Sequence, residues 1–417
     1  MLDKYLYIPE VDKNKHIIAT YYVESHHLVS AVEAIAIGQS IGNPNVRLDN
    51  ETKQLLTRNL AKILDMKPNL EGKRSATVRI AYPLVNINLK EDGVTQLLAT
   101  LMGGQMDIDI IEACRLQHID YPAGMSKYFK GPKIGMDAIR RRAGASNRCL
   151  VGGIVKPKTG MTPQALKEVC LDLVRGGVDF IKEDEILGNP AFCPFDERVK
   201  LVADAVNREA DRQGREVFYA PCINSDYPYF LERAQKAVKY GAKAVHLNIW
   251  GGLSAYRALR DLDLDLAIFF QKSGDQVMTS KRNPFSINWG VITTLARMLG
   301  CDFAHAGMWG GYLSDPQDVL EHILSSLRAK GTFKKTVPSF SCGCHPGLVP
   351  SIIKHFGTEL MLNVGGAIHG HPGGTCAGAR AMRQAVTGAL EADDFLKYAR
   401  TKPELQTAID KWGYVNE

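Results

Sequence analysis

The stretch GGVDFIKEDEILGN, residues 176–189, places ionisable side chains directly after an apolar run. Residues i and i+2 of a strand share a face, so Lys182 and Asp184 are expected to point the same way, with Glu185 at the strand end. Carboxylate oxygens are ligands that suit Mg²⁺. The lysine is then either a charge partner of the carboxylates or, with its pKa lowered by burial, an amine that takes up CO2 and becomes a carbamate ligand. The alternative is a structural ion pair or a solvated turn.

Two further lysines occur in GGIVKPKTGMTP, residues 152–163. Lys156 and Lys158 stand on either side of a proline that fixes the turn. Such a pair suits an enolising site, because one lysine can move a proton while the other polarises a carbonyl or orients its partner. Thr162 and Pro163 look like the N-cap and first residue of the following helix. For an isolated K-P-K, two solvated loop lysines are the simpler interpretation.

Small residues near the end of the chain predict an anion site. In LNVGGAIHGHPGG, residues 362–374, Gly365 and Gly366 lie where backbone N–H groups and a helix N-terminus can hold a phosphate, although a plain glycine-rich loop is the alternative. SCGCHPG, residues 341–347, offers C-x-C-H, but no second pair with zinc-finger spacing follows. Ser341 as a hydrogen-bond donor to substrate is therefore favoured over zinc. His305, in FAHAGMWGG, is either a structural group or a catalyst.

Strands and helices must position these residues, and from about residue 149 the chain alternates between the two. Each short apolar run is followed by a segment with helical spacing. The predicted strands are residues 149–157, 179–186, 217–224, 244–250, 266–271, 301–307, 337–343 and 361–366. Eight such repeats predict a (β/α)8, or TIM, barrel, and the rival is a doubly wound open sheet. Polar residues at nearly every strand end favour the barrel.

Active sites of such barrels lie at the C-terminal ends of the strands. The residues there are two carboxylates, several lysines, a histidine, three amides, one hydroxyl and a glycine pair. They are Lys156, Lys158, Lys182, Asp184, Glu185, Asn224, Asn248, Gln271, Lys272, His305, Ser341, Gly365 and Gly366. This combination predicts a metal site beside an anion site.

Residues 1–130 follow a different pattern and predict a smaller α+β domain of ferredoxin-like type. Strands are expected at 15–25 and 75–87, and helices at 27–42 and 92–104. Residues 131–417 are assigned to the barrel, with a helical tail after about residue 392. The whole chain is therefore expected to be an α/β protein of two domains.

The composition excludes several classes of protein. The chain has 417 residues with a formal charge of +6, and no block of five or six like charges indicates nucleic acid or membrane binding. A basic pocket for an anionic small molecule fits this mild excess better. The nine cysteines are scattered, which indicates a reducing compartment. The first residues are charged and lack the apolar region of a signal peptide, so the expected location is cytoplasmic.

Five segments, in this order, resemble motifs of the ribulose-bisphosphate carboxylase superfamily, and the resemblance extends over the whole chain. GGIVKPKTG is similar to the motif of its first barrel strand, and GGVDFIKEDE to the motif of its activator lysine. DFAHAGMWGG is similar to the sixth-strand histidine segment that leads into a mobile loop. VPSFSCGCHPG and LNVGGAIHGHPGG are similar to its two phosphate segments.

The resemblance implies roles for individual residues. Lys156 is then the base that removes or returns a proton at the substrate carbon, supported by Lys158. Lys182 is carbamylated and completes a Mg²⁺ site with Asp184 and Glu185. The implied contacts to substrate or its phosphate are His305, Ser341, Gly343, Gly365, Gly366 and Lys272. Family members are antiparallel dimers in which one subunit's N-terminal domain closes the other's barrel, so we expect a homodimer with a shared site.

Four departures from the carboxylases point to the non-carboxylating form IV branch, the RuBisCO-like proteins. Tyr312 stands where carboxylases have the loop lysine that polarises CO2. Gly38 and Gly104 replace a glutamate and an asparagine of the N-terminal domain. Gln271-Lys272 replaces a histidine-arginine pair. Together these changes argue against carboxylation of ribulose bisphosphate.

What remains is a Mg²⁺-dependent core for forming an enolate from a phosphorylated keto sugar, in a lyase or an isomerase. The first hypothesis is decarboxylation or C–C cleavage of a phosphorylated β-keto sugar acid, of the 3-oxo-isoapionate 4-phosphate type in apiose breakdown. The second is an enolase or isomerase of a methylthio-sugar phosphate in methionine salvage, with Met308, Trp309 and Phe270 as an apolar pocket. The third is a non-catalytic regulator that binds sugar phosphates, against which the retained lysines and carboxylates speak.

Overall fold

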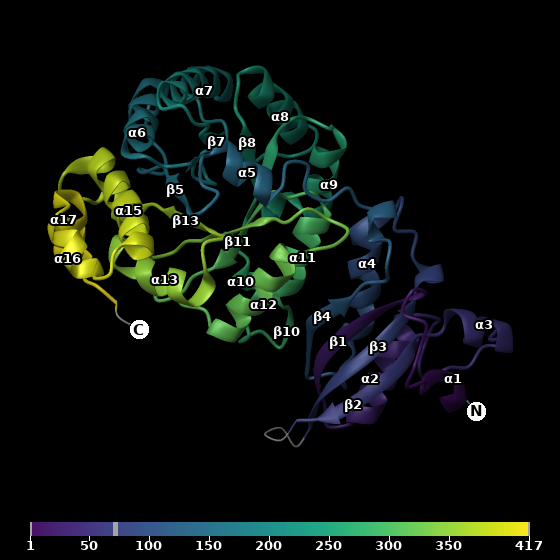
Figure 1. Cartoon of the computed structure of the whole chain (residues 1–417). Helices are drawn as coiled ribbons and strands as arrows, with labels where there is room; N and C mark the ends of the chain where they lie inside the picture. The colour runs from purple at the N-terminus through teal and green to yellow at the C-terminus, as the bar shows by residue number, and fades with distance from the viewer. Residues whose placement is uncertain (1, 70–73, 416–417) are drawn as a thin grey trace. The chain divides into compact units, whose positions relative to one another are not determined.

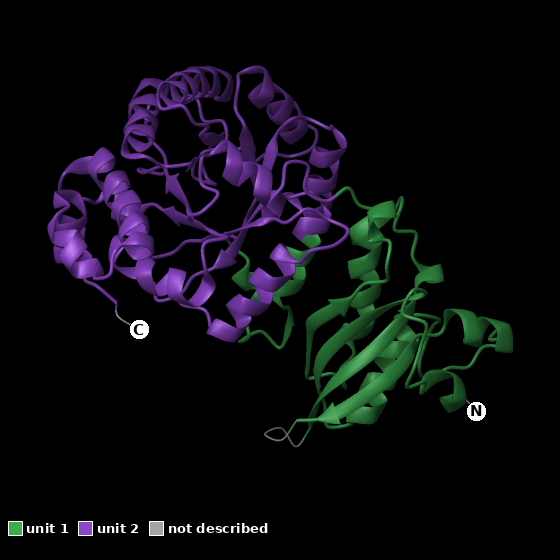
Figure 2. Cartoon of the chain, viewed as in Figure 1, with its two compact units in different colours: residues 1–130, 274–295 green, residues 131–273, 296–417 purple. Residues whose placement is uncertain are grey.

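The computed structural model describes residues 2–69 and 74–415. The chain forms two compact units (Figure 2): residues 1–130 with 274–295, and residues 131–273 with 296–417. The sequence analysis assigned 274–295 to the barrel. This segment instead joins the first unit, because β10 (Phe285–Ile287) pairs in parallel with β4 (Ala113–Asp120). A strand of three residues carries too little periodicity to be recognised in a sequence.

The first unit is built on a five-stranded sheet with the order β10-β4-β1-β3-β2. Strand β1 (His16–Glu24) lies at its centre and pairs antiparallel with β3 (Ser75–Pro83) and with β4. Strand β2 (Lys62–Pro68) pairs with β3. The predicted strands at 15–25 and 75–87 are confirmed, while β2 and β4 were not predicted. The fold of this unit is α+β, as expected.

Helix α2 (Leu28–Gly38) packs its apolar residues against this sheet. In α2 a run of alanine, valine and isoleucine side chains is buried, and the helix contacts β1, β2 and β3. The remaining helices are α1 (Asp3–Leu6), α3 (Lys53–Asn59), α4 (Gly93–Leu101) and α10 (Gln276–Thr279), with 3₁₀ turns at Leu84–Asn86, Gly104–Asp107 and Met125–Lys127.

The second unit contains an eight-stranded parallel sheet with the order β7-β6-β5-β13-β12-β11-β9-β8. A single bridge between Cys222 and His246 links the two ends of this order, so the sheet is nearly closed. All eight predicted barrel strands are present. They are β5 (Leu150–Ile154), β6 (Phe180–Lys182), β7 (Phe218–Ala220), β8 (Ala244–Asn248), β9 (Ala267–Gln271), β11 (Phe303–Gly307), β12 (Val337–Phe340) and β13 (Met361–Val364).

Helix α5 (Met136–Arg142) precedes the first barrel strand, and further helices follow the strands and surround them (Figure 1). They are α6 (Pro163–Gly176), α7 (Phe195–Arg212), α8 (Tyr229–Lys239), α9 (Leu253–Asp261), α12 (Gln317–Arg328), α13 (Val349–Phe356), α14 (Gly366–His369) and α15 (Gly374–Glu391), with 3₁₀ turns at Ile249–Gly251 and Pro346–Leu348. Helix α11 (Trp289–Met298) begins in the segment assigned to the first unit and ends in the second. The helix after the first barrel strand begins as predicted, because the Thr162 hydroxyl accepts a hydrogen bond from Ala165 N at 3.3 Å and Pro163 is its first residue.

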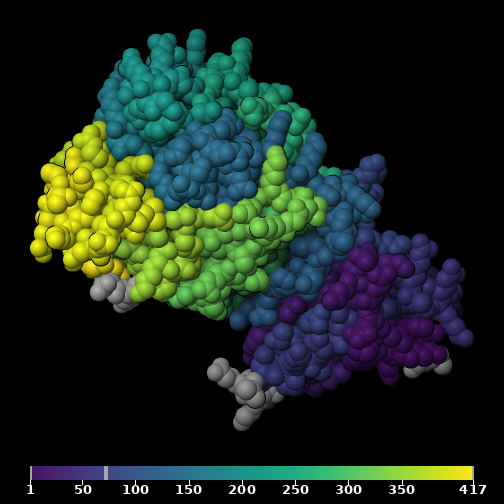
Figure 3. All heavy atoms as spheres, in the orientation of Figure 1, coloured from purple at the N-terminus to yellow at the C-terminus, as the bar shows by residue number. Residues whose placement is uncertain are grey.

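The C-terminal tail adds two helices, α16 (Phe395–Arg400) and α17 (Pro403–Trp412), which both contact α15. In the space-filling view of Figure 3 the tail and α15 lie together in one region, coloured yellow. Among the described residues, no helix combines the length and the apolar character needed to cross a membrane.

The barrel interior is apolar toward the N-terminal ends of the strands. Phenylalanine side chains from four strands meet there, and the rings of Phe180 and Phe303 are 4.7 Å apart between centroids. Burial of each such side chain contributes on the order of 1.5–3 kcal/mol. Because side chains alternate along a strand, Lys182 lies on the same face as Phe180 and His305 on the same face as Phe303, one step nearer the C-terminal end. The apolar layer therefore supports the polar side chains above it.

Candidate active site

Lys182 ends β6 and is almost completely buried, with a relative exposure of 1%. Its Nζ donates to the backbone oxygen of Glu183 at 2.9 Å and to Glu185 Oε2 at 3.3 Å. Burial lowers the pKa of Lys182, and the charges of Glu185 and Asp184 oppose that shift only in part. For Glu185, burial acts to raise the pKa, but the ammonium of Lys182 and nearby hydrogen bonds bring it to about 2. Lys182 and Glu185 therefore form an ion pair at the strand end.

Lys156 follows β5, and its Nζ is 2.8 Å from Asp184 Oδ2. The carboxylate of Asp184 is buried, whereas the lysine side chain is 31% exposed. Strand β5 pairs with β6 such that Ile154 is opposite Lys182, which brings the two strand ends together. The lysine expected to move a proton thus contacts a carboxylate expected to bind the metal.

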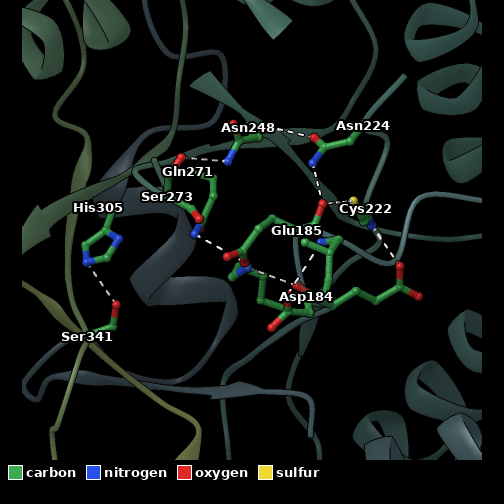
Figure 4. Close-up of polar contacts among 12 residues, drawn as sticks. Asp184, Glu185, Cys222, Asn224, Asn248, Gln271, Ser273, His305 and Ser341 are labelled. Atoms are coloured by element: carbon green, nitrogen blue, oxygen red, sulfur yellow. Dashed lines mark hydrogen bonds and ion pairs between the residues drawn. The ribbon is translucent and has the colours of Figure 1, made fainter. Parts of the chain in front are cut away.

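A chain of amide side chains continues from Glu185 across the next strands (Figure 4). Asn224 Nδ2 donates to the backbone oxygen of Glu185 at 2.6 Å, and Asn224 Oδ1 accepts from Asn248 N at 2.8 Å. Asn248 Nδ2 donates to the backbone oxygen of Ser273 at 3.0 Å. From β9, Gln271 Nε2 reaches Glu185 Oε2 at 3.5 Å. Glu185, Asn224, Asn248 and Gln271, four of the predicted strand-end polar residues, therefore form one hydrogen-bonded group.

His305 and Ser341 form a second, adjacent pair. Ser341 Oγ and His305 Nε2 are 2.9 Å apart and both side chains are buried. Burial lowers the pKa of His305 to about 3, helped by the positive charges of Lys272 and Lys182. His305 is therefore neutral near pH 7. The buried Lys272 lies close enough for its charge to act on this imidazole.

The predicted glycines lie on the same side of the barrel but differ in surroundings. A Cβ built on Gly365 would be 3.3 Å from Lys156 Cε, so that glycine lies against the lysine, whereas a Cβ on Gly366 would meet nothing within 4 Å. Gly343 has φ +104°, and a Cβ there would be 2.5 Å from the backbone nitrogen of Tyr312. Glycine at 343 therefore permits the loops after β11 and β12 to approach one another.

Lys158 is the predicted residue that the structure does not bring into the group. Its side chain is exposed, and within residues 2–69 and 74–415 no hydrogen bond or ion pair connects it to Lys156, Asp184 or Glu185. The K-P-K motif predicts the turn, but it does not predict which way each lysine side chain points.

The donor set fits a hard cation. Asp184 and Glu185 supply carboxylate oxygens, and a buried lysine whose pKa is lowered has more of the neutral amine that carbamate formation requires. Gln271 Oε1 is a further buried oxygen without a hydrogen-bond partner. In the described ranges no group of three or more His, Cys, Asp and Glu side chains could hold a metal. Lys182, if carbamylated, would add a third oxygen donor to Asp184 and Glu185.

Residues that sequence reasoning missed lie directly behind the site. His369, in the glycine-rich segment, has its Nε2 2.9 Å from the backbone oxygen of Ile154, just before Lys156. Arg198, on α7, is fully buried and binds both carboxylate oxygens of Glu183 at 3.0 and 3.1 Å. An arginine among the apolar positions of an amphipathic helix was the available signal.

The four positions that depart from the carboxylase pattern can also be located. Tyr312 is in the loop after β11 and is 87% exposed. Gly38 ends α2, where a Cβ would clash with the side chain of Gln105. Gln105 N in turn donates to Gln39 Oε1 at 3.1 Å, so the segments around Gly38 and Gly104 do meet within the first unit.

Comparison with known proteins agrees with the family resemblance of the sequence motifs. The N-terminal domain of the ribulose bisphosphate carboxylase large chain matches residues 5–125, and its catalytic domain matches residues 135–412. A ribulose bisphosphate carboxylase of Pyrococcus furiosus is 32% identical over 96% of this chain and 94% of the relative. The 2,3-diketo-5-methylthiopentyl-1-phosphate enolase of Bacillus licheniformis is 30% identical over 92% of this chain and 94% of the relative.

Two solved structures extend the comparison. An octameric ribulose-1,5-bisphosphate carboxylase/oxygenase from Pyrococcus horikoshii superposes with a TM-score of 0.92 at 27% identity, covering 100% of this chain and 98% of the other. A rubisco-like protein from Alicyclobacillus acidocaldarius superposes with a TM-score of 0.85 at 31% identity, covering 95% and 100%. Both the fold and the family predicted from the motifs are confirmed: this chain belongs to the ribulose bisphosphate carboxylase large-chain family, in which it resembles the RuBisCO-like proteins.

Proposed function

We propose that this protein is a Mg²⁺-dependent enzyme that forms and protonates the enolate of a phosphorylated keto sugar and does not carboxylate it. The observation that carries the proposal is the 2.8 Å contact between Lys156 Nζ and Asp184 Oδ2. It puts a proton-carrying side chain next to the carboxylates of Asp184 and Glu185, where a substrate held by the metal would lie. The tyrosine at 312 supports the second half of the proposal, because no ammonium is offered there to CO2.

In this mechanism, Asp184, Glu185 and carbamylated Lys182 would hold Mg²⁺, which would act as a Lewis acid that stabilises negative charge on the substrate. Lys156 removes or returns the proton at the adjacent carbon. Neutral His305 and the Ser341 hydroxyl orient a substrate oxygen by hydrogen bonding. Backbone N–H groups near Gly343, Gly365 and Gly366, with Lys272, hold the phosphate, as the anion site predicted for this end of the barrel requires.

For the substrate, we favour a phosphorylated β-keto sugar acid that loses CO2, such as 3-oxo-isoapionate 4-phosphate. Loss of CO2 yields an enolate directly, which Lys156 can protonate, and no CO2-binding lysine is needed. The side chains suggested for a methylthio pocket offer little support for the other substrate. Trp309 donates to Ser351 Oγ at 3.1 Å and packs on Phe356, while Phe270 packs on Tyr256 at 4.8 Å between ring centroids. Those contacts are with helices outside the strands.

A methylthio-sugar phosphate is the second candidate. One observation favours it: the Bacillus licheniformis relative that matches over 92% of this chain is named an enolase of such a compound. Both candidate reactions use the same proton transfer by Lys156. They differ in that the sugar acid loses CO2, whereas the methylthio-sugar phosphate is only enolised or isomerised. A homodimer with a shared site belongs to the same proposal and is tested separately by light scattering.

Proton NMR in D2O, with Mg²⁺ and bicarbonate present, distinguishes the candidates. CO2 release from 3-oxo-isoapionate 4-phosphate, with deuterium at the new carbon, would support the first. Exchange or isomerisation of a methylthio-sugar phosphate alone would support the second and eliminate the first. A protein that binds either compound without exchange or turnover, and whose binding is unchanged by Lys182→Ala, would be a non-catalytic binder.

A further inference from the structure

Glu183 lies between two residues of the proposed metal site, yet its side chain points away from them. Strand alternation directs Lys182 and Asp184 to the barrel interior and Glu183 outward, toward α7. The side chain of Glu183 is completely buried. Its Oε1 accepts from Arg198 Nε at 3.0 Å and from the Tyr219 hydroxyl at 2.5 Å. Its Oε2 accepts from Arg198 Nη2 at 3.1 Å and from Cys222 N at 2.8 Å.

The guanidinium of Arg198 also binds the loop that carries Glu185. Its Nη1 donates to the backbone oxygen of Cys193 at 2.9 Å, and its Nη2 to that of Gly188 at 2.7 Å. The side chain stacks on Phe195, with 5.1 Å from its central carbon to the ring centroid. One buried group on α7 therefore fixes the end of β6 and two points of the loop between β6 and α7.

Stability alone is a weak reason for such a pair. Removing two charges from water costs about as much as their attraction returns, and apolar side chains of similar volume stabilise a core equally well or better. The pair instead fixes an orientation, because the planar guanidinium of Arg198 holds the carboxylate of Glu183 through two hydrogen bonds. Rotation of Glu183 about the chain would turn its neighbours Lys182 and Asp184 out of the site.

We propose that Arg198 is a positioning residue for the metal site: through Glu183 and the loop carbonyls it orients Asp184 and Glu185 for binding a divalent cation. The proposal rests on the proposed function for the existence of that cation site. Metal affinity commonly falls about 10- to 100-fold when a residue that orients a ligand is replaced. An effect of that size is expected here.

The first test uses Mn²⁺ as the probe and electron paramagnetic resonance as the readout, with the full-length protein in bicarbonate. Arg198→Lys keeps the charge but removes the fork, so we expect Mn²⁺ binding to weaken about tenfold or more. The matched control is Arg208→Lys on the same helix, where the arginine is 73% exposed and paired with Asp204 at 3.0 Å. It should bind Mn²⁺ as the wild type does.

A second variant separates positioning from folding. The double variant Glu183→Leu with Arg198→Met leaves no unpaired buried charge, so it should still fold cooperatively. Its thermal unfolding temperature should be lower than that of the wild type, because the Tyr219 hydroxyl, Cys222 N and two backbone oxygens lose their partners. Its Mn²⁺ affinity should be as weak as that of Arg198→Lys. Wild-type affinity in the folded double variant would overturn the proposal. Lack of Mn²⁺ binding by the wild type would overturn it together with the proposed function, whereas catalytic silence combined with the expected Mn²⁺ result would count against the proposed function only.

Discussion

Replacing Lys156 by methionine tests the proposed proton transfer most directly. Methionine has a similar length and lacks the ammonium, so the change removes one ion pair and little volume. The lost contact is that between Lys156 Nζ and Asp184 Oδ2 at 2.8 Å, and the lysine side chain is 31% exposed. Asp184 is only 2% exposed, so loss of the ammonium leaves a buried carboxylate without this partner, at a cost of about 1–3 kcal/mol. The thermal unfolding temperature should therefore fall by only a few degrees.

The expected effect on the reaction is larger. Loss of a positioned general acid or base lowers rates by about 10²- to 10⁴-fold. At about 1.4 kcal/mol for each factor of ten, this raises the barrier by roughly 3–5 kcal/mol. For a proton carrier, the rise in the activation barrier exceeds the loss of folding free energy. A residue that only supports the fold would lose more folding free energy than catalytic rate.

The assay is deuterium incorporation by NMR with whichever of the two test substrates the wild type converts, together with a thermal unfolding curve. Lys200→Met, an exposed lysine on α7, is the matched control and should retain the wild-type rate. If Lys156→Met incorporates deuterium at more than a tenth of the wild-type rate, Lys156 is not the proton carrier. A large loss of both rate and stability would equally refute the reasoning, because the contact would then be structural.

Four other perturbations have distinct expected outcomes. Removal of divalent cations with EDTA should abolish turnover, and Mg²⁺ with bicarbonate should restore it more fully than Mg²⁺ alone, as measured by the same NMR assay. Gly343→Ala should destabilise the protein by about 1–3 kcal/mol in urea unfolding, because φ is +104° there and a Cβ would meet Tyr312 N at 2.5 Å. It should also raise KM, because the loop moves away from the proposed phosphate site; unchanged stability and KM would refute this. Asp302→Ala should destabilise the protein by about 4 kcal/mol or more in urea unfolding, because its carboxylate pairs with the buried Arg260 at 2.7 Å and accepts from three backbone N–H groups. Burial lowers the pKa of His369 to about 4 from an unfolded value near 6.5. The neutral imidazole therefore contributes fully to the free energy of unfolding above pH 6.5, and this contribution declines by at most about 3 kcal/mol as the pH falls toward 4. In urea unfolding, a His369→Gln variant should lose less free energy of unfolding than the wild type over that range.

The strands were predictable because each barrel strand is a short apolar run that ends in polar residues. The same regularity indicated which side chains gather at the C-terminal ends, including Lys182, Asp184 and His305. Their contacts were not predictable, since these depend on register between strands. The 2.9 Å contact of His305 with Ser341 requires β11 and β12 to pair with an irregularity just after His305, which no spacing in the sequence specifies.

Side chains in the loops and helices that follow the barrel strands were less predictable for a different reason. Lys158 has the same type and nearly the same position as Lys156, yet one is exposed and the other contacts Asp184. Direction around a proline turn is set by tertiary packing, which the motif does not encode. Arg198 was overlooked because a charged residue on a helix is usually solvent-exposed, although its place among the apolar positions of α7 was a signal.

The N-terminal end of the barrel shows a regularity that the sequence does contain. GVDF, residues 177–180, and GCDF, residues 300–303, each place an aspartate just before a strand. Asp179 accepts from Val151 N at 2.9 Å and pairs with Arg148 at 2.6 Å, and Asp302 accepts from Ile268 N at 3.0 Å in the same way. Each carboxylate thus binds the backbone of the preceding strand in the barrel. This device can recur because it satisfies backbone groups that any parallel strand presents. The opposite ends of the strands carry a different side chain each time, which is why substitutions there are expected to change the reaction and substitutions at Asp179 or Asp302 the stability.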